Sequence, residues 1–511
     1  MPRKGSSSSV RDSRQRSRVL SRLPRRSHAA AAVVLLSMAL TMAKAIANVV
    51  ASARTAPSRD FQLDHHLSTK TLYAHRTAPP GGVPLDQIPP PEGCNPSFIY
   101  LLSRHGARYP TSGKMKLASS VAPLLARSGA PALQDWEYVF AGESQLNGQL
   151  HRLGAEELSG IGRRYAARFP GIFDPHVTSD PIPSTFTLVR STQKPRCSAS
   201  AVAFMKGFTQ AAFPLSMAPL ERDPLLRFFD MCPAYGRYKD AVKECLGKWA
   251  EGLWAEMVPS VAKRLQLVSG DAPTPQEVGA LWALCQQEAM LGRQDWACAL
   301  FTPEQLRTLE WVEDVSALDT KAYGSCLAYQ MAAPLMLDST AALRSAANQS
   351  LGSAGEAAAP RSVLNFAHAE TIIPYSSLLG MFGSPGACNL SSCGLGAEQG
   401  APCQADGWYA PARLPRDGPR RDVFRGSAAA PFAANVAHIL YVCPPRLGTG
   451  ARHLVRTVYN EYAVPLPACD GQLDCPLEDF LAIADSLDNN ILNTACQEPG
   501  GAHCRPATSH E

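Results

Sequence analysis

The sequence alternates between short apolar runs and stretches with helical spacing, and this alternation limits the folds open to the chain. Four runs have the length of buried strands: FIYLL (98–102), FTLV (186–189), VLNF (363–366) and HILYV (438–442). Helix-like sequence follows the second and the third run. Strands that alternate with helices are typical of the α/β class, so we expect a mainly parallel sheet flanked by helices.

The region between the second and the third run differs, because it has helical spacing and few strand signals. Thr302-Pro303-Glu304 is a favourable helix start, with threonine as the cap and proline at the first position. We therefore expect an α-helical insertion at 215–350 in an α/β core formed by 94–214 and 351–490. The other expected divisions are a basic leader at 1–55, a Pro/Gly-rich linker at 56–93 and a C-terminal tail at 491–511.

The amino terminus has the features of a targeting segment. Basic residues continue to Arg26, an apolar stretch covers 29–43, and Ala51-Ser52-Ala53 fits a signal-peptide cleavage site. The apolar stretch is shorter than the roughly 20 residues of a membrane span. If Lys44 reaches the interface, the segment 29–51 serves as an uncleaved anchor. We expect a signal peptide, and membrane contact only if the leader is retained as an anchor.

The leader also accounts for the formal net charge of +5. Residues 1–55 hold 11 of the 49 Lys and Arg residues and one acid, which leaves 38 basic and 43 acidic residues in the rest. The folded part therefore has no overall charge that favours nucleic acid, and we expect no nucleic-acid partner. Any affinity for anions must come from a local cluster of basic residues.

Cysteines and glycosylation sequons agree with passage through the secretory pathway. The chain has 15 cysteines and the sequons Asn348-Gln349-Ser350 and Asn389-Leu390-Ser391. Because 15 is odd, at least one thiol is free or paired outside the chain. Two cysteine pairs are close enough in sequence to be candidate bridges, Cys388 with Cys393 and Cys469 with Cys475. We expect a disulfide-bonded glycoprotein that is secreted or held in the endoplasmic-reticulum lumen.

The first apolar run ends at Arg104-His105-Gly106-Ala107-Arg108, which places an imidazole between two guanidinium groups. Guanidiniums repel a metal cation, but they bind phosphate oxygens bidentately. Their charge disfavours the imidazolium, so His105 stays neutral and available as a nucleophile at mildly acidic pH. Gly106 lets the backbone approach a ligand. The same residue types also fit a solvated basic turn, so the motif needs context.

Two further polar clusters supply that context. TLVRSTQKPRCSAS (187–200) places Arg196 at a helix start, where backbone N–H groups favour an anion. NFAHAE (365–370) ends the third run with His368 and Glu370, and a carboxylic acid can protonate the departing oxygen in phosphoryl transfer. Ordinary surface charges at a helix start, and caps of a strand and a helix, also explain these clusters. Ligands of parallel sheets bind where the strands end, so we expect the clusters to meet there.

Other catalytic patterns are absent or have the wrong spacing. His368-Ala369-Glu370 matches part of a zinc-deaminase signature that also needs P-C-x-x-C. Here Pro385 lies three residues before Cys388 and the next cysteine is Cys393, so the spacing fails. The sequence has no G-x-S-x-G, H-E-x-x-H or Walker A motif. We expect neither a metal nor another cofactor.

Together, the three clusters resemble the histidine phosphatase superfamily, in its acid phosphatase and phytase branch. That branch carries R-H-G-x-R-x-P, an arginine after the second strand region and a late H-D or H-A-E, and all three occur here in this order. The late His368-Ala369-Glu370 is most similar to the multiple inositol polyphosphate phosphatases. LNGQLHRLGAEELSGIGRRYAARFP (146–170) and FAANVAHILYVC (432–443) are similar to that family too. The resemblance extends from about Cys94 to about Phe480.

The resemblance implies a role for each matching residue. His105 is the nucleophile that forms a phosphohistidine, and Glu370 donates the proton to the leaving inositol oxygen and then assists water. The residues that bind the transferred phosphoryl group are Arg104, Arg108, Arg196 and His368. The residues that meet other phosphates of the substrate are Thr111, Lys114 and Lys194. The implied fold is an α/β core with an inserted helical domain, and no metal is implied.

The function that we expect is hydrolysis of inositol polyphosphates, phytate (inositol hexakisphosphate) above all. A general histidine acid phosphatase or a 2,3-bisphosphoglycerate phosphatase keeps the chemistry with another substrate. A secreted polyanion-binding protein with a decayed site is the non-enzyme alternative, and the presence of all three clusters argues against it. The chain ends at Ser509-His510-Glu511 without the closing leucine of a retention signal, so we expect secretion at least as much as retention.

Overall fold

The computed structural model describes most of the chain beyond residue 60. The described residues are 61–133, 136–172, 181–209, 211–268, 271–291, 296–350, 360–383, 424–445 and 452–497. The leader at 1–55, the second sequon and the pair Cys388 and Cys393 lie outside them. No helix of the described part is long and apolar enough to cross a membrane.

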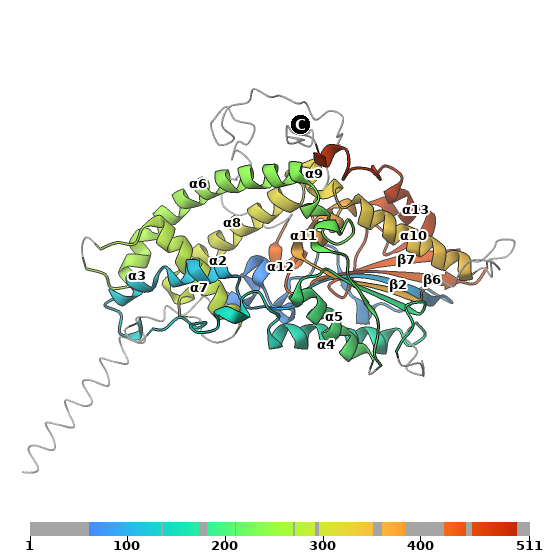
Figure 1. Ribbon diagram of the computed structural model, residues 1–511, viewed down its shortest axis with the longest axis horizontal. Coiled ribbons are helices and arrows are strands. Elements are labelled where there is room, and N and C mark those ends of the chain that lie inside the picture. The colour runs from blue at the N-terminus through green and yellow to red at the C-terminus, as the bar shows by residue number, and fades with distance from the viewer. Residues whose placement is uncertain are drawn as a thin grey trace, which may run out of the picture. The chain divides into compact units, whose positions relative to one another are not determined.

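A mixed sheet forms the centre of the fold (Figure 1). The strand order is β1-β8-β7-β6-β2-β5-β3-β4, and β9 pairs with β7. The longer strands are β2 (Asn95–Arg104), β3 (Thr187–Ser191), β5 (Ser362–Ala367), β6 (Asn435–Cys443) and β7 (Arg452–Tyr459). The short strands are β1 (Val83–Pro84), β4 (Leu215–Ser216), β8 (Tyr462–Ala463) and β9 (Asp474–Pro476).

Each of the four predicted apolar runs overlaps one of the longer strands. β5 runs parallel to β2 on one side and to β3 on the other, which agrees with the predicted α/β class. β6 differs from the expected parallel arrangement, because it is antiparallel to both β2 and β7. A parallel neighbour of β6 would need a crossover connection of about a dozen residues or more, and only residues 444–451 separate β6 from β7.

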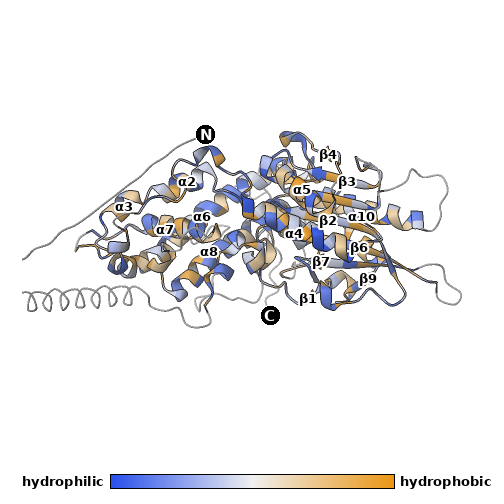
Figure 2. Cartoon of the chain, turned by 90° about the horizontal axis from the view of Figure 1, so that it is seen from below, coloured by the Kyte–Doolittle hydropathy of each residue, from blue (hydrophilic) through white to orange (hydrophobic). Residues whose placement is uncertain are grey.

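Helices cover both faces of the sheet, as predicted. Side chains alternate along β2, so Tyr100 and Leu102 face one core with α10 and α11, and Ile99 and Leu101 face another core with α4 and α5. These helices are α4 (Arg152–Arg168), α5 (Pro195–Phe208), α10 (Ala333–Ser350) and α11 (Ala369–Leu378). In Figure 2 the helices carry mixed polar and apolar colours, which is typical of helices that bury one side.

A group of helices lies between β4 and β5 in sequence. Besides α10, it consists of α6 (Pro233–Arg264), α7 (Pro275–Met290), α8 (Pro303–Lys321) and α9 (Cys326–Gln330). α8 begins at the predicted position, where Thr302 and Gln305 form a capping box. Part of α7 shares a core with two helices that follow β2, α2 (Ser112–Ser119) and α3 (Ala122–Ala126).

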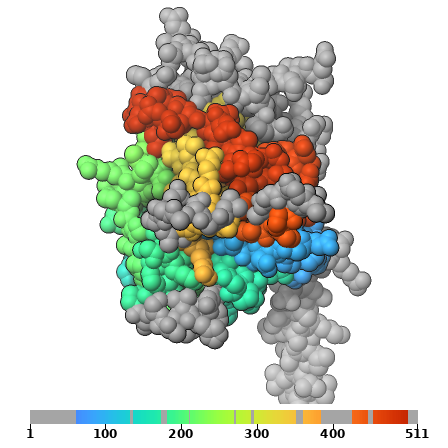
Figure 3. All heavy atoms as spheres, turned by 90° about the vertical axis from the view of Figure 1, so that its right-hand side faces the viewer, coloured from blue at the N-terminus to red at the C-terminus, as the bar shows by residue number. Residues whose placement is uncertain are grey.

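The segment 61–93, where we expected a linker, packs on the fold. Phe61, Leu67 and Tyr73 are buried, and the β1 strand pairs with β8. Figure 3 shows this blue segment lying against the orange and red C-terminal strands. We predicted a linker from the Pro/Gly content and overlooked the apolar side chains before residue 79. Burial of these side chains supplies the energy for packing.

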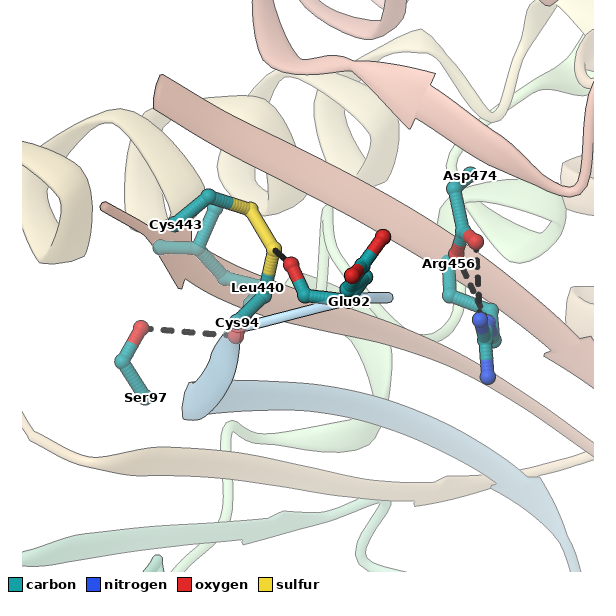
Figure 4. The surroundings of a disulfide bond; sticks show 7 residues. All are labelled: Glu92, Cys94, Ser97, Leu440, Cys443, Arg456 and Asp474. Atoms are coloured by element: carbon teal, nitrogen blue, oxygen red, sulfur yellow. Dashed lines mark hydrogen bonds and ion pairs between the residues drawn. A yellow bond between two sulfur atoms is a disulfide. The ribbon is translucent and has the colours of Figure 1, made fainter. Parts of the chain in front are cut away.

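Disulfides join both distant and neighbouring segments of the chain. Those among the described residues are Cys94–Cys443, Cys232–Cys496, Cys285–Cys298 and the predicted Cys469–Cys475. Figure 4 shows Cys94–Cys443 linking the segment before β2 to the end of β6, near the partly buried ion pair of Arg456 with Asp474. Cys197 is a free cysteine. These disulfides indicate an extracellular or luminal protein.

We predict that the long-range disulfide stabilises the fold more than the short-range one. Cys94–Cys443 closes 349 residues and Cys469–Cys475 closes 6. Loop-closure entropy then makes the loss of unfolding free energy about 3–4 kcal/mol larger for the double serine variant of the first pair than for that of the second. Urea unfolding of both variants measures the difference. Equal losses would contradict the prediction.

Candidate active site

The carboxyl ends of β2 and β5 bring the first and the third polar cluster together. Arg104, at the end of β2, is opposite Ala367 at the end of β5. The next residues, His105 and His368, therefore leave the sheet side by side. The His105 N–H donates to the Ala367 carbonyl (3.0 Å), and the two imidazole centroids are 5.8 Å apart.

Arg196 reaches the same place from the other neighbour of β5. β3 pairs with β5 in parallel, and the chain then turns into α5, which begins with Pro195. Arg196 Nη2 lies 3.3 Å from His368 Nδ1. The three polar clusters thus meet at the edge of the sheet where the parallel strands end.

His105 is neutral and has one ring nitrogen available. Its side chain is buried, and its Nδ1 lies 2.9 Å from the Gly106 carbonyl oxygen, which only accepts, so Nδ1 carries the proton. Burial, followed by the charges of Arg104, Arg196 and Arg108, lowers the pKa of His105 well below its usual range. Its Nε2 is therefore an unprotonated nitrogen of a ring that lies near three guanidinium groups.

Four arginines near the imidazoles have hydrogen-bond donors without acceptors. The buried Nε atoms of Arg104, Arg108, Arg196 and Arg227 have no hydrogen-bond partner among the described residues. Burial and then the charge of Arg108 lower the pKa of Arg104 to about 9, and burial and then Arg196 lower that of Arg108 to about 10. Cations that destabilise one another in this way favour an anion, and the guanidinium fork matches phosphate.

Arg104 is anchored by two segments that sequence analysis did not connect with it. Its Nη1 donates to the carbonyl of Thr69 (2.6 Å) and to that of Ala430, and its guanidinium carbon lies 4.5 Å from the centre of the Phe432 ring. Thr69 belongs to the expected linker, in η2 (Ser68–Lys70). Ala430 is 326 residues from Arg104, and such a contact leaves no local pattern in the sequence.

Two basic residues at the site were not predicted. Arg227 Nη1 lies 2.9 Å from His368 Nε2, and Lys321 Nζ at the end of α8 lies 3.8 Å from Glu370 Oε1. Both come from the helical stretch between β4 and β5. No motif surrounds either residue, so only the tertiary structure identifies them.

Glu370 lies in the first turn of α11, and its carboxyl group is ionised. Burial alone raises the pKa of a carboxyl group, but Lys321, then His368, a backbone N–H and Arg104 outweigh burial and lower the pKa of Glu370 to about 2. Because the side chain keeps 42% of its surface exposed, solvent screens part of this attraction. Glu370 faces the cations of the same cluster as His105.

Helix α4 fixes the loop that carries His105. Glu157 accepts the Ala107 N–H on Oε2 (2.8 Å) and the Tyr73 N–H on Oε1 (2.8 Å). Burial raises the pKa of this carboxyl to about 7, although both N–H groups stabilise its charge. Gly106 packs backbone to backbone against Gly154, because a Cβ on Gly106 would lie 2.3 Å from the Gly154 carbonyl oxygen.

Two of the residues expected to meet other phosphates differ in their relation to the cluster. Thr111 and Arg196 both lie beside Gly148, where an added Cβ would be 4.0 Å from Thr111 Cγ2 and 3.9 Å from Arg196 Nη1. Lys194 directly precedes α5. We find no hydrogen bond or ion pair from the Lys194 side chain to the cluster within the described residues.

Lys114, the third of these residues, belongs to a group of lysines. Its side chain keeps a large exposed surface, but partial burial and then the charge of Lys70 lower its pKa. Glu313, which also pairs with Lys70, opposes this shift, and Arg108 and Lys243 add to it. Burial and the charges of Lys70 and Lys243 also lower the pKa of Lys321, against the opposing effect of Glu370. These lysines extend the positive charge beyond the arginines.

A cavity of about 450 Å³ lies away from these residues, beside β8. Its arginines are already paired: Arg164 with Glu461, Arg168 with the carbonyls of Leu85 and Ile88, and Arg76 with the carbonyls of Tyr73 and Asn460. Among the described residues, no group of three or more His, Cys, Asp or Glu side chains is arranged to hold a metal. Among the described residues, the cluster around His105 is the candidate site with the strongest local charge.

Comparison with known proteins places this cluster in a family. A profile of the histidine phosphatase superfamily (branch 2) matches residues 97–460. The chain belongs to this superfamily. Residues 97–460 contain all three polar clusters, so the predicted resemblance is confirmed at this level.

Individual relatives have low sequence identity to this chain, but their alignments cover most of its length. Multiple inositol polyphosphate phosphatase 1 of Gallus gallus is 26% identical over 390 residues, which cover 73% of this chain and 77% of the relative. The crystal structure of the phytase from D. castellii has a TM-score of 0.61 at 16% identity. The match covers 85% of this chain and 88% of the phytase chain. The Bifidobacterium longum multiple inositol polyphosphate phosphatase in complex with inositol hexasulfate has a TM-score of 0.57 at 18% identity, covering 81% and 96%. The phytase-like α/β fold is thereby confirmed.

We predict that Gly106→Ala destabilises the protein, because the new Cβ would meet the backbone of Gly154. We expect a loss of about 1–3 kcal/mol in the free energy of unfolding, as for other overpacked sites. Gly113→Ala in α2 is the control, since no atom lies within 4 Å of its added Cβ. Urea unfolding of both variants measures the effect. Equal stability of the two variants would contradict the close packing of α4 on the loop.

Proposed function

We propose that the protein is a phosphomonoesterase that hydrolyses inositol polyphosphates, with inositol hexakisphosphate as a substrate, through a phosphohistidine. The observation that supports this most is the neutral His105. Burial and then the charges of Arg104, Arg196 and Arg108 lower its pKa, and these arginines have buried Nε donors without partners among the described residues. A nucleophile inside an anion-binding cage is what phosphoryl transfer requires.

The first step transfers the phosphoryl group to the protein. Arg104, Arg108, Arg196 and His368 bind its oxygens, and His105 Nε2 attacks phosphorus. An N–P bond forms while the ester O–P bond breaks, and Glu370 gives its proton to the departing inositol oxygen. In the second step water attacks phosphorus and Glu370 takes a proton from that water. An O–P bond forms while the N–P bond breaks, so inorganic phosphate leaves and His105 returns to the free imidazole.

Glu370 must gain a proton before it can act as an acid, because the cations Lys321 and Arg104 help to lower its pKa to about 2 although burial raises it. A polyphosphate brings negative charge to Lys321 and Arg104 and so weakens the stabilisation that they give to the Glu370 carboxylate. Its own charge also raises the pKa of Glu370. Substrate binding therefore loads the acid for the first step.

The substrate class follows from the charges around the nucleophile. Lys114 and Lys321, with Lys70 and Lys243 near both, extend positive charge past the arginines that bind one phosphoryl group. A substrate with many phosphates gains most from such a surface, and the named relatives act on inositol polyphosphates or phytate by their names. A general acid phosphatase or a 2,3-bisphosphoglycerate phosphatase is the second candidate, and a polyanion binder without turnover is the third.

The remaining proposals concern location and organisation. Disulfides support secretion or residence in the endoplasmic-reticulum lumen, and we propose that the leader directs the chain there. Asn348 is exposed on α10 and is a candidate glycosylation site. We keep the division into a core and a helical insertion at 215–350 as a proposal.

The first test replaces the nucleophile. His105→Ala should abolish phosphate release from inositol hexakisphosphate, 2,3-bisphosphoglycerate and an aryl phosphate at about pH 5, where the neutral wild-type imidazole stays active. Labelled phosphate should be trapped on the wild-type protein in an acid-labile form. Inositol hexakisphosphate should give the highest kcat/KM of the three substrates.

His453→Ala is the matched control, because His453 lies at the opposite end of the sheet, bound to Ser350. It should keep wild-type activity. Activity that survives in His105→Ala would end the phosphohistidine proposal. Binding of inositol hexakisphosphate by the wild-type protein without turnover would favour the polyanion binder.

The second test concerns the proton donor. Glu370→Gln should slow hydrolysis of inositol hexakisphosphate by about 10²–10⁴-fold, since a sugar alkoxide needs a proton to leave. An aryl phosphate with a good leaving group should be slowed much less at the transfer step, which the initial burst of phenol measures. Equal slowing of that burst on both kinds of substrate would remove Glu370 from the acid role.

A further inference from the structure

The ring of His368 has hydrogen-bond donors on both sides. Arg227 Nη1 lies 2.9 Å from Nε2, Thr192 Oγ1 lies 3.1 Å from the same nitrogen, and Arg196 Nη2 lies 3.3 Å from Nδ1. A guanidinium group only donates, whereas a hydroxyl can donate or accept. Each arginine therefore favours an acceptor at the nitrogen that it faces, but a neutral ring has only one acceptor nitrogen.

His368 is neutral, so one of its nitrogens carries a proton and the other does not. Burial, then Arg196, with Glu370 opposing, and then Arg227 and Arg104 lower its pKa well below the usual range. The proton position in a neutral imidazole is set by the hydrogen bond that the other nitrogen makes. Cys197 Sγ is 3.6 Å from both nitrogens and does not discriminate between them.

The distances favour a proton on Nδ1. A proton on Nε2 would face the Arg227 donor at 2.9 Å, whereas Nε2 as an acceptor makes a charge-assisted hydrogen bond there. The hydroxyl of Thr192 can rotate to suit either state. With the proton on Nδ1, the Nδ1–H and Arg196 Nη2 are donors 3.3 Å apart, and two donors at that separation can share one anionic oxygen.

We propose that Arg227 is a positioning residue that fixes His368 as the Nδ1–H tautomer, so that His368 and Arg196 donate to the same oxygen of the phosphoryl group. This inference rests on the proposed function of the site. It assigns a role in the phosphatase site to a residue of the helical stretch between β4 and β5.

Arg227 is held well enough for this task. Its guanidinium pairs with Asp230 and lies 5.1 Å from the centre of the Phe229 ring. The preceding residue is tied to α11, because Thr371 Oγ1 donates to the Leu226 carbonyl (2.8 Å). Since His368 directly precedes α11, this bond fixes the two partners on adjoining backbones.

Nitrogen NMR of protein labelled at histidine tests the tautomer directly. His368→Ala assigns the signals, and we expect the wild-type ring to show a protonated Nδ1 and a bare Nε2. In Arg227→Met the proton should move to Nε2, where Thr192 can accept it. Arg227→Lys, which keeps a donor, should keep the wild-type tautomer, and so should Arg222→Met at an exposed neighbouring arginine. The signal of buried His438 shows whether each variant is folded.

Kinetics supply the second readout. Arg227→Met should lower kcat/KM about 10–100-fold on both an aryl phosphate and inositol hexakisphosphate, a loss typical of removing a residue that orients a functional side chain. Arg227→Lys should recover much of the loss. A loss confined to inositol hexakisphosphate would overturn the inference, because Arg227 would then be a contact for another phosphate.

A wild-type His368 with its proton on Nε2, or an unchanged tautomer in folded Arg227→Met, would also overturn the inference. The wild-type measurement decides even if Arg227→Met does not fold. Failure of the proposed function gives a different pattern. Wild-type protein that cleaves the aryl phosphate but not inositol hexakisphosphate would refute the substrate and leave the tautomer result intact.

Discussion

The parallel pairing of β5 with β2 and with β3 is the constraint on which the site depends. Arg104 is opposite Ala367, and Ser191 is opposite Phe366, so the three strands β2, β3 and β5 end at the same level of the sheet. A slip of one residue would turn each side chain to the other face and separate His105 from His368. The buried Asn365 helps to hold this register, because its Nδ2 donates to the Leu101 carbonyl (3.2 Å).

The second constraint is electrostatic. Arg104, Arg108 and Arg196 are close enough to affect one another's charge or that of His105, and burial deprives them of water. Such an arrangement costs stability, which packing elsewhere has to offset. The long-range disulfides and the two cores on either face of the sheet supply that stability. Burial, followed by these charges, keeps both imidazoles neutral, which the proposed roles of His105 and His368 require.

Sequence analysis predicted those parts of the site that have a local pattern. The polar residues His105, Arg196 and His368 each follow a strand or begin a helix, and apolar runs mark those strands well. Arg227 and Lys321 were missed because a basic residue in a helical stretch is ordinarily a solvated one. The anchoring of Arg104 by Thr69 was missed for another reason, since it depends on how a segment of short 3-10 helices packs on the rest of the fold. The antiparallel direction of β6 was missed because an apolar run records burial and not strand direction.

The free thiol of Cys197 lies directly beneath this site. It is buried against His368, and burial raises its pKa to about 11, so the sulfur stays protonated and weakly nucleophilic. A folded molecule therefore shields this sulfhydryl from oxidants in the compartment where its other described cysteines are bridged. Any loosening of the strands around His368 would unmask it. The extent of Cys197 alkylation therefore reports whether the cluster around His105 is assembled, and the measurement needs no substrate.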